Sequence, residues 1–289
     1  MARTKEELHI ASRKRKNALF HGLFFASTLI GVLALVMLIY QVVSQGIGWL
    51  DWDFLTNNSS RRPERSGIYT ALIGTIWLMA IVAPLTFVIG VGTAIYLEEY
   101  AKDTKLSRFI QTNISNLAGV PSIVYGILGL TIFVRIFAFG QSILSGALTM
   151  TLLVLPVIIV AAQEAIKAVP GSLRHASFAL GANRWQTIVR VVLPSAMPGI
   201  LTGSILSLSR AIGETAPLIV VGAAAFIVRP PEHLLSQFTV LPIQIYTWSS
   251  QPQAEFQNIS AAAILVLLVI LLGMNAVAII LRNKFQKRL

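Results

Sequence analysis

The sequence predicts an all-α membrane protein with six transmembrane helices, on three observations. Of its 289 residues, 55% are hydrophobic and only 12% are charged, about half of the roughly 25% charged residues found in soluble domains. Six apolar runs are long enough to cross a bilayer as helices, which takes about 20 residues each. The Lys and Arg residues behind the net charge of +11 lie mostly in short segments between these runs. That distribution indicates membrane loops and argues against a nucleic-acid-binding surface.

The six runs set the expected order of elements and of domains. We expect residues 1–67 to form a basic leader, the first helix and an external loop, and residues 68–289 to form a core of five helices with a long loop at 163–195. The first run is too long for the apolar part of a cleaved signal peptide, so it is predicted to remain as an anchor helix. Pro121 and Pro156 fall inside the third and fourth runs, where we expect kinks. The runs are 18–43, 68–97, 110–134, 143–162, 196–228 and 256–281.

The distribution of Lys and Arg predicts the orientation in the membrane. Segments 1–17, 98–109, 163–195 and 282–289 together hold 17 of these residues, while the segments on the opposite side hold five. Cytoplasmic loops carry the excess of positive charge, so both termini are predicted to be cytoplasmic, although the Arg61–Arg62 pair opposes this assignment. We expect a multi-pass protein of a bacterial or archaeal plasma membrane.

Several chemistries are excluded or lack support in the sequence. There is no cysteine, so disulfides and thiolate metal sites cannot form. The four histidines are scattered without the spacing of metal ligands, and no metal or cofactor is expected. The chain also has no G-x-x-x-x-G-K-[ST] phosphate-binding loop, so it is predicted to be no ATPase and no enzyme.

The loop at 163–195 is predicted to present a short helix away from the bilayer. Pro170 and Gly171 should end the fourth helix, Ser172 should cap the start of the new helix, and Gly181 should cap its end. An apolar helix facing water suggests a partner groove, whereas packing on the chain's own helix ends is the alternative. The apolar side chains concerned are Leu173, Phe178, Leu180 and Trp185.

The spacing in this loop resembles the "EAA" loop of ABC-importer permeases. That pattern reads Glu-Ala-Ala, three residues, Gly, nine residues, Ile, one residue and Leu-Pro. Here His175-Ala176-Ser177 is followed at the same spacing by Gly181, Val191 and Leu193-Pro194, with His175 and Ser177 in place of Glu and Ala. The resemblance implies a type I ABC importer permease fold with a cytoplasmic coupling helix that docks onto a separate ATPase. It assigns the docking to His175, Ala176, Ser177, Phe178, Leu180, Gly181 and Trp185.

The fifth run carries two features of its own. Small residues recur every four positions at Gly199, Gly203, Ser207 and Ala211, a stripe that permits close helix packing. We assign helix packing to Gly199, Gly203 and Ala211, and we place Ser207 on the translocation path as well.

Arg210 and Glu214 also lie four residues apart and should share a helix face as an ion pair. A charge inside the bilayer costs about 3 kcal/mol or more, so the two are not expected to face lipid. They form either a structural ion pair between helices or the polar lining of a solute path, in which the arginine meets an anion.

The segment Ser209-Arg210-Ala211-Ile212-Gly213-Glu214-Thr215-Ala216-Pro217 resembles phosphate importer permeases of the PstA type. Gly119 to Gly126 and the stretch Tyr96-Leu97-Glu98-Glu99-Tyr100 are similar to the same family. The resemblance implies a PstC-like second permease subunit, an ATPase dimer and an external phosphate-binding protein as partners. It makes Arg210 and Glu214 candidates for the translocation path.

Other functions stay open on the residues alone. The chain could be a permease for another oxyanion such as sulfate or molybdate. An intramembrane enzyme would use Glu214 as acid or base, although no second catalytic group is visible. A membrane scaffold without transport is the third alternative.

Overall fold

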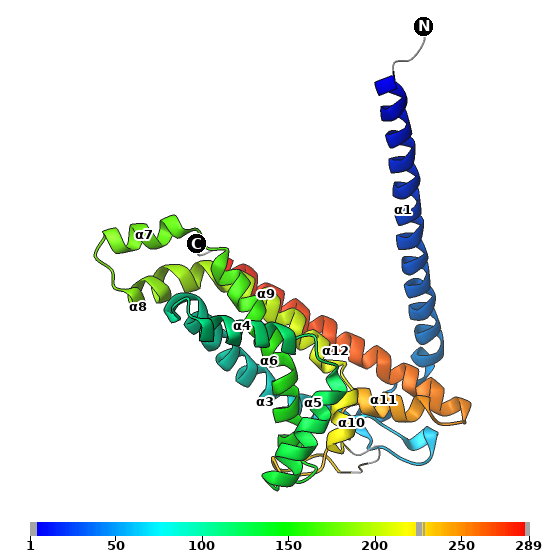
Figure 1. Cartoon of the computed structure of the whole chain (residues 1–289). Coiled ribbons are helices and arrows are strands. Elements are labelled where there is room, and N and C mark those ends of the chain that lie inside the picture. The colour runs from blue at the N-terminus through cyan, green and yellow to red at the C-terminus, as the bar shows by residue number, and fades with distance from the viewer. Residues whose placement is uncertain (1–4, 224–226, 228, 287–289) are drawn as a thin grey trace.

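In this computed structural model, which describes residues 5–223, 227 and 229–286, every regular element is helical (Figure 1). The ends of the predicted leader and tail (1–4 and 287–289) and part of the fifth run (224–226 and 228) lie outside the described residues. The α-helices are α1 (Lys5–Gly46), α2 (Trp52–Thr56), α3 (Tyr69–Ile95), α4 (Lys105–Leu117), α5 (Ser122–Gly129), α6 (Ile143–Lys167), α7 (Gly171–Ala179), α8 (Arg184–Thr187), α9 (Leu193–Ile212), α10 (Ala216–Val221), α11 (Leu241–Ser249) and α12 (Ala254–Gln286).

The described residues contain the predicted membrane helices. Five helical segments are long and apolar enough to cross a membrane, and a bent pair of helices makes a sixth if it counts as one span. The five are Lys16–Trp49, Tyr69–Tyr100, Ile143–Lys167, Arg184–Ile212 and Ala254–Lys284. The predicted all-α membrane fold is therefore confirmed.

The third predicted span is corrected by the structure. In place of one kinked helix over 110–134, α4 and the α5 segment meet at 105° across a short break. Pro121 lies directly before α5 and has no N–H to continue a helix from α4. The Tyr125 hydroxyl donates to the Leu117 carbonyl across the bend at 2.8 Å, which holds α5 against the end of α4.

The fifth predicted span is also corrected. The helix that holds it begins at Arg184, well before residue 196, and ends at Ile212. Pro217 explains the interruption, because in a continuous helix its ring would clash with the carbonyl four residues earlier and it has no N–H to donate to that carbonyl. The chain turns through Gly213 and restarts as α10, in which Pro217 occupies the first turn.

The bundle is built around α6, which packs against α3 on one side and α9 on the other. Residues 238–244, which form the approach to α11 and its first turn, are buried. Thr75 of α3 accepts a hydrogen bond from the Leu241 backbone at 2.9 Å, and Gly74 lies directly against the Thr239 carbonyl. The segment after α10 is therefore fastened to α3 at the end of the bundle opposite α7.

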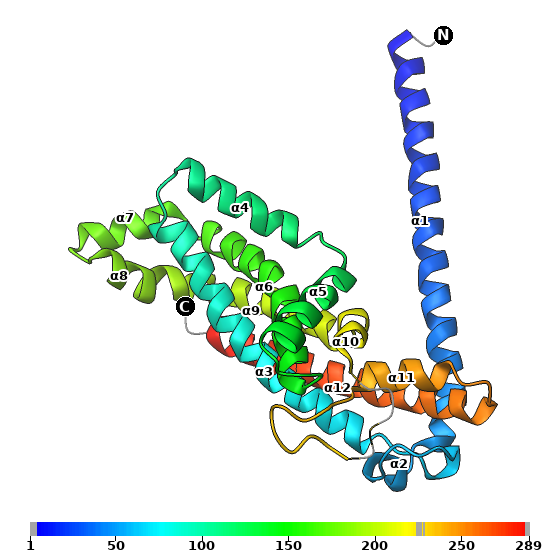
Figure 2. The same cartoon turned by 60° about the horizontal axis from the view of Figure 1, so that its bottom comes forward.

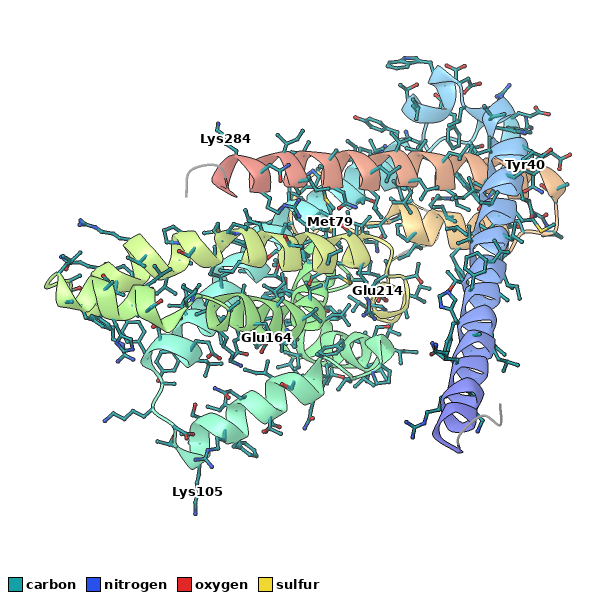
Figure 3. All side chains as sticks on the ribbon, turned by 90° about the horizontal axis from the view of Figure 1, so that it is seen from above. Tyr40, Met79, Lys105, Glu164, Glu214 and Lys284 are labelled. Atoms are coloured by element: carbon teal, nitrogen blue, oxygen red, sulfur yellow. The ribbon has the colours of Figure 1, made fainter. Side chains whose placement is uncertain are left out.

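Helix α1 stands apart from this bundle (Figures 1 and 2). It packs mainly on α12, where Gly46 meets the backbone of Ala261 and Ala262. Seen from above, Tyr40 of α1 and Lys284 of α12 lie at opposite ends of the molecule, and Lys284 is on the side of the α7–α8 hairpin (Figure 3). Apart from this contact with α12, the apolar surface of α1 is left uncovered by the other described residues.

Candidate functional site

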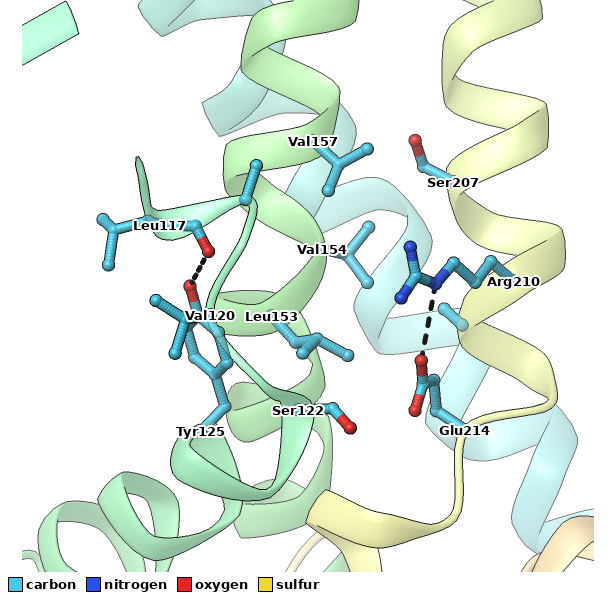
Figure 4. A pocket seen from close by; sticks show the side chains of 12 residues that line it. Leu117, Val120, Ser122, Tyr125, Leu153, Val154, Val157, Ser207, Arg210 and Glu214 are labelled. Atoms are coloured by element: carbon cyan, nitrogen blue, oxygen red, sulfur yellow. Dashed lines mark hydrogen bonds and ion pairs between the residues drawn. The ribbon is translucent and has the colours of Figure 1, made fainter. Parts of the chain in front are cut away.

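Three residues predicted to line a translocation path line one pocket (Figure 4). Ser207 and Arg210 come from α9, and Glu214 comes from the turn that follows it. The other walls are α6, the start of α5 and the bend between α4 and α5. These walls contribute Leu117, Ala118, Val120, Ser122, Tyr125, Leu153, Val154 and Val157, and Ala211 of α9 completes the lining.

Arg210 and Glu214 form an ion pair, but not on one helix face as predicted. Helix α9 ends at Ile212, so Glu214 folds back from the turn toward the last helical turn. The Arg210 Nε lies 3.5 Å from the Glu214 Oε1, and the side chains are 76% and 18% exposed, respectively. A cation in a last helical turn also lies near the partial negative charge of the helix C-terminus, which is favourable.

The guanidinium of Arg210 is left available by this arrangement. It points into the pocket (Figure 4), and Glu214 is its one ion-pair partner among the described residues. A guanidinium offers five N–H donors in a planar fork that matches the oxygens of a tetrahedral oxyanion. Among the described residues, these donors have no protein acceptor besides Glu214.

Ser207 lies on the pocket wall, although its hydroxyl is engaged within α9. It donates to the Gly203 carbonyl at 2.8 Å, and the residue is only 7% exposed. Its contribution to the wall is therefore a small side chain that leaves room beside Arg210.

The small-residue stripe packs α9 closely onto α6. A Cβ atom added to Gly199 would lie 2.8 Å from the Ala165 Cβ, and one added to Gly203 would lie 2.5 Å from the Ala161 Cβ. Both distances are shorter than van der Waals contact, so larger residues would push the helices apart. Ala211 is buried on the same stripe, and the stripe thus fixes the position of Arg210 relative to α6.

The predicted short helix exists as α7, which projects with α8 from one end of the bundle (Figure 1). Gly181 ends it in the left-handed conformation, at φ +82°, which glycine adopts without steric cost. The predicted N-cap at Ser172 is wrong, because the helix already begins at Gly171, directly after Pro170. The prediction also missed the capping box of α8, in which Asn183 and Gln186 exchange hydrogen bonds, although its Asn-x-x-Gln pattern is readable in the sequence.

The apolar side chains of this loop face outward. Leu180 is 90% exposed and Trp185 is 63% exposed, so they do not pack on the chain's own helix ends. His175 and Ala176 are exposed too, and Ser177 is half-buried because its hydroxyl meets that of Thr187 at 2.9 Å. The remaining apolar side chains, Leu173 and Phe178, are 42% and 46% exposed.

Sequence reasoning missed the contact that fixes α7 to the bundle. Arg174, next to His175, reaches the Glu99 carboxylate at 2.9 Å. Both side chains are largely buried, with 22% and 12% exposed. The two residues are 75 positions apart, and no spacing rule links them.

Comparison with known proteins gives a consistent result. Residues 86–289 match the family described as "Binding-protein-dependent transport system inner membrane component". The phosphate transport system permease protein PstA 1 of Mycobacterium tuberculosis (strain ATCC 25618 / H37Rv) is 36% identical, over 96% of this chain and 90% of the relative. The probable ABC transporter permease protein YqgI of Bacillus subtilis (strain 168) is 33% identical, over 92% of this chain and 95% of the relative. PstA of Haemophilus influenzae is 29% identical, over 94% and 96%.

Solved structures show the same fold. A chain of the bacterial alginate ABC transporter superposes with a TM-score of 0.65 at 15% identity, over 92% of this chain and 94% of that chain. A chain of the inward-facing MetNI methionine ABC transporter gives a TM-score of 0.62 at 19% identity, over 75% and 97%. At these identities the likeness concerns the fold alone.

Proposed function

The chain belongs to the family of binding-protein-dependent transport system inner membrane components, as an ABC importer permease of the PstA type, and we propose that it imports phosphate. It forms one half of the translocation path, and a PstC-like permease forms the other half. An external phosphate-binding protein delivers the anion. ATP is hydrolysed on a separate ATPase dimer, and residues 68–289 make up the permease core.

The observation that carries this proposal is the uncommitted guanidinium of Arg210 in the pocket between α5, α6 and α9. An anion entering a low-dielectric path loses its hydration, and a fixed cation offsets that cost. The relatives that are 36% and 29% identical over nearly the whole chain are named as phosphate permeases, which supports phosphate as the anion.

Glu214 has a complementary role in this proposal. Its carboxylate contacts Arg210 through Nε at 3.5 Å and leaves the rest of the fork free. The acid keeps the arginine oriented and lowers the net charge of the site. A solute path must bind its ion weakly enough to release it, so Glu214 prevents Arg210 from trapping phosphate.

The α7–α8 hairpin docks onto the ATPase. The exposed side chains of Leu180, Phe178 and Trp185 form an apolar helix surface that fits a groove on a partner. With α7 docked onto the ATPase, α7 and both termini lie on the cytoplasmic side of the membrane, and the excess of Lys and Arg in those segments supports this orientation.

ATP binding closes the motor dimer, α7 moves with it, and the bundle opens toward the external binding protein. Hydrolysis returns the path to its inward-open form.

Uptake of labelled phosphate into liposomes that hold the assembled complex tests the role of Arg210. We expect Arg210→Gln to lower uptake at least about tenfold, the range for losing a hydrogen bond to a charged group, and Glu214→Gln to lower it less. Arg135→Gln is the matched control, because this exposed arginine lies outside the pocket. Unchanged uptake by Arg210→Gln would remove the residue from the path, and stronger inhibition by sulfate or molybdate than by unlabelled phosphate would change the assigned anion.

Binding of the purified ATPase to the permease pair tests the docking surface. Leu180→Asp should weaken binding about tenfold or more, since burying a leucine contributes roughly 1.5–3 kcal/mol. Leu206→Asn is a suitable comparison, because Leu206 is 67% exposed on α9, away from the hairpin. Equal binding by the Leu180→Asp variant and the wild type would contradict docking through this surface.

A further inference from the structure

Three consecutive residues at the end of α3 contact three different elements of the docking-loop region. They lie in a π-helical turn, Tyr96–Tyr100, that extends α3 beyond Ile95. Glu98 contacts α6, Glu99 contacts α7 and Tyr100 contacts Arg184 at the start of α8. We propose that the segment Glu98–Tyr100 is the joint through which movement of α7 reaches the transmembrane helices, with Glu99 and Arg174 as its positioning residues. This inference rests on the proposed docking of α7 to an ATPase.

Arg174 is the strongest link in the joint. Its Nε and Nη2 both donate to the Glu99 Oε1, at 3.1 and 2.9 Å. The same guanidinium donates to the carbonyls of Val169 and Ile166, at 2.7 and 3.0 Å. Ile166 lies in the last turn of α6 and Val169 two residues beyond the end of that helix, where backbone carbonyls are open to side-chain donors. One side chain on α7 therefore joins the ends of both α3 and α6.

A second link holds the other arm of the hairpin. The Arg184 guanidinium carbon lies 5.1 Å from the centroid of the Tyr100 ring, within the range of a cation–π interaction. The hydroxyls of Ser177 and Thr187 also meet at 2.9 Å between the two arms. The hairpin is therefore fixed to α3 on both sides of its tip.

The third link joins α3 to α6 directly. Gln163 donates to the Glu98 Oε1 at 2.8 Å, and the Lys167 ammonium lies 3.5 Å from the same atom. These contacts tie the ends of α3 and α6 into one unit beneath the hairpin. While these contacts are intact, a displacement of α7 must also displace α3 and α6.

Helix α3 carries the displacement to the other end of the bundle. There Thr75 accepts the hydrogen bond from the Leu241 backbone, and Gly74 abuts the Thr239 carbonyl. The buried segment that leads into α11 thus rests on the helix that the joint drives. Because α3 is attached at both ends, a change at the joint and a change at the segment before α11 can each shift its position.

The joint is tested in the assembled complex by the number of phosphate ions taken up per ATP hydrolysed. We expect Glu99→Gln and Arg174→Gln to lower this ratio at least about fivefold, the lower end of coupling between sites, while the ATPase still binds. The doubly reversed variant Glu99→Arg/Arg174→Glu should recover part of the ratio, which a defect in folding alone would not do.

Asp103→Asn is the matched control for the loss of a carboxylate. Asp103 also pairs with an arginine, Arg108, but both side chains are largely exposed, at 78% and 68%, and among the described residues neither forms a hydrogen bond or ion pair with the hairpin. This variant should keep the wild-type ratio. If Glu99→Gln prevents assembly, Tyr100→Leu removes the cation–π link without removing a charge, and it should lower the ratio less steeply.

A measurement of position separates the joint from the transport function. The chain has no cysteine, so nitroxide labels can be placed on Tyr96→Cys and Ser172→Cys alone. Tyr96 is 61% exposed, and Ser172 is an exposed residue of α7 outside the proposed docking surface. We expect one narrow distance distribution, and a broad one after Glu99→Gln. If Glu99→Gln changed neither the distance distribution nor the ratio of phosphate to ATP, the proposed joint would be contradicted. A wild-type complex without ATP-driven phosphate uptake would instead overturn the proposed function, and the distance measurement would still decide on the joint.

Discussion

Two arginine–carboxylate pairs of this chain differ in how each arginine is held. Arg174 donates four hydrogen bonds, two of them to Glu99 and two to backbone carbonyls, and both side chains are mostly buried. Arg210 makes a single 3.5 Å contact with Glu214 and is 76% exposed. The same two chemical groups therefore form a hydrogen-bonded link between helices at one end of the bundle, and in the pocket they leave an arginine with free N–H donors.

The difference shows what holds each arginine side chain in position. Arg174 is fixed by its own side-chain bonds, which use most of the N–H donors of its guanidinium. Arg210 is fixed by the helix that carries it, because the small residues of α9 lock that helix onto α6. A side chain held by its backbone keeps its donors free, as a site for a passing anion requires.

The largest effect is expected when the packing beneath Arg210 is broken. Gly203→Leu places side-chain atoms where the Ala161 Cβ lies 2.5 Å from a first added carbon. Overpacking of this kind costs about 1–3 kcal/mol or more, so we expect loss of assembly or a large fall in melting temperature, with uptake abolished. Gly92→Leu is the control, because a Cβ on that glycine of α3 meets nothing within 4 Å. A stable, active Gly203→Leu complex would show that α9 does not depend on this contact.

A smaller and more specific effect is expected from lysine at each arginine. An ammonium group cannot reproduce a planar fork that serves a carboxylate and two carbonyls at once, so Arg174→Lys should lower the phosphate-to-ATP ratio several-fold. Arg210→Lys keeps the positive charge but offers three donors in place of the planar fork, so uptake should fall, but less than in Arg210→Gln. The ratios and the uptake rates are measured on the same liposome preparations. If Arg210→Lys proves the more damaging change, the planar fork contributes more in the pocket than at the joint.

The sequence predicted these regions unequally. Hydrophobic run length located the five long membrane helices and the bent pair, and the recurrence of Gly199 and Gly203 predicted a packing face, because both signals are local and periodic. A kink was predicted at Pro121, but not the 105° bend found there, and the break at residues 213–215 was not predicted. A proline shows where a helix is interrupted, but the packing of the flanking helices decides the angle. Arg174 was missed because its partner lies 75 residues away, and pairing over such a distance is set by tertiary structure.

The smallest effect is expected at a third pair, Asp103 with Arg108, which lies in solvent. The Arg108 side chain donates to both Asp103 oxygens, at 2.7 and 3.1 Å, and this hydrogen bonding lowers the pKa of Asp103 below its ordinary value. A carboxyl whose pKa is depressed by folding stabilises the fold above its unfolded pKa, and this contribution is lost as the pH falls through the lower, folded value. The pair is therefore fully formed at neutral pH, and no titration of it is expected between about pH 6 and 8.

The high exposure of both side chains limits what this pair contributes to stability, since solvent screens exposed ion pairs. Asp103→Asn should leave the melting temperature and the uptake rate within error of the wild type at about pH 7, and the two melting curves should stay together up to about pH 8. Thermal unfolding of the purified complex at several pH values provides the measurement. A clear loss of stability in Asp103→Asn would mean that burial does not explain why the Arg174–Glu99 pair should be stronger than an exposed pair. The difference between Arg174 and Arg210 would then have to be explained by the number of their hydrogen bonds alone.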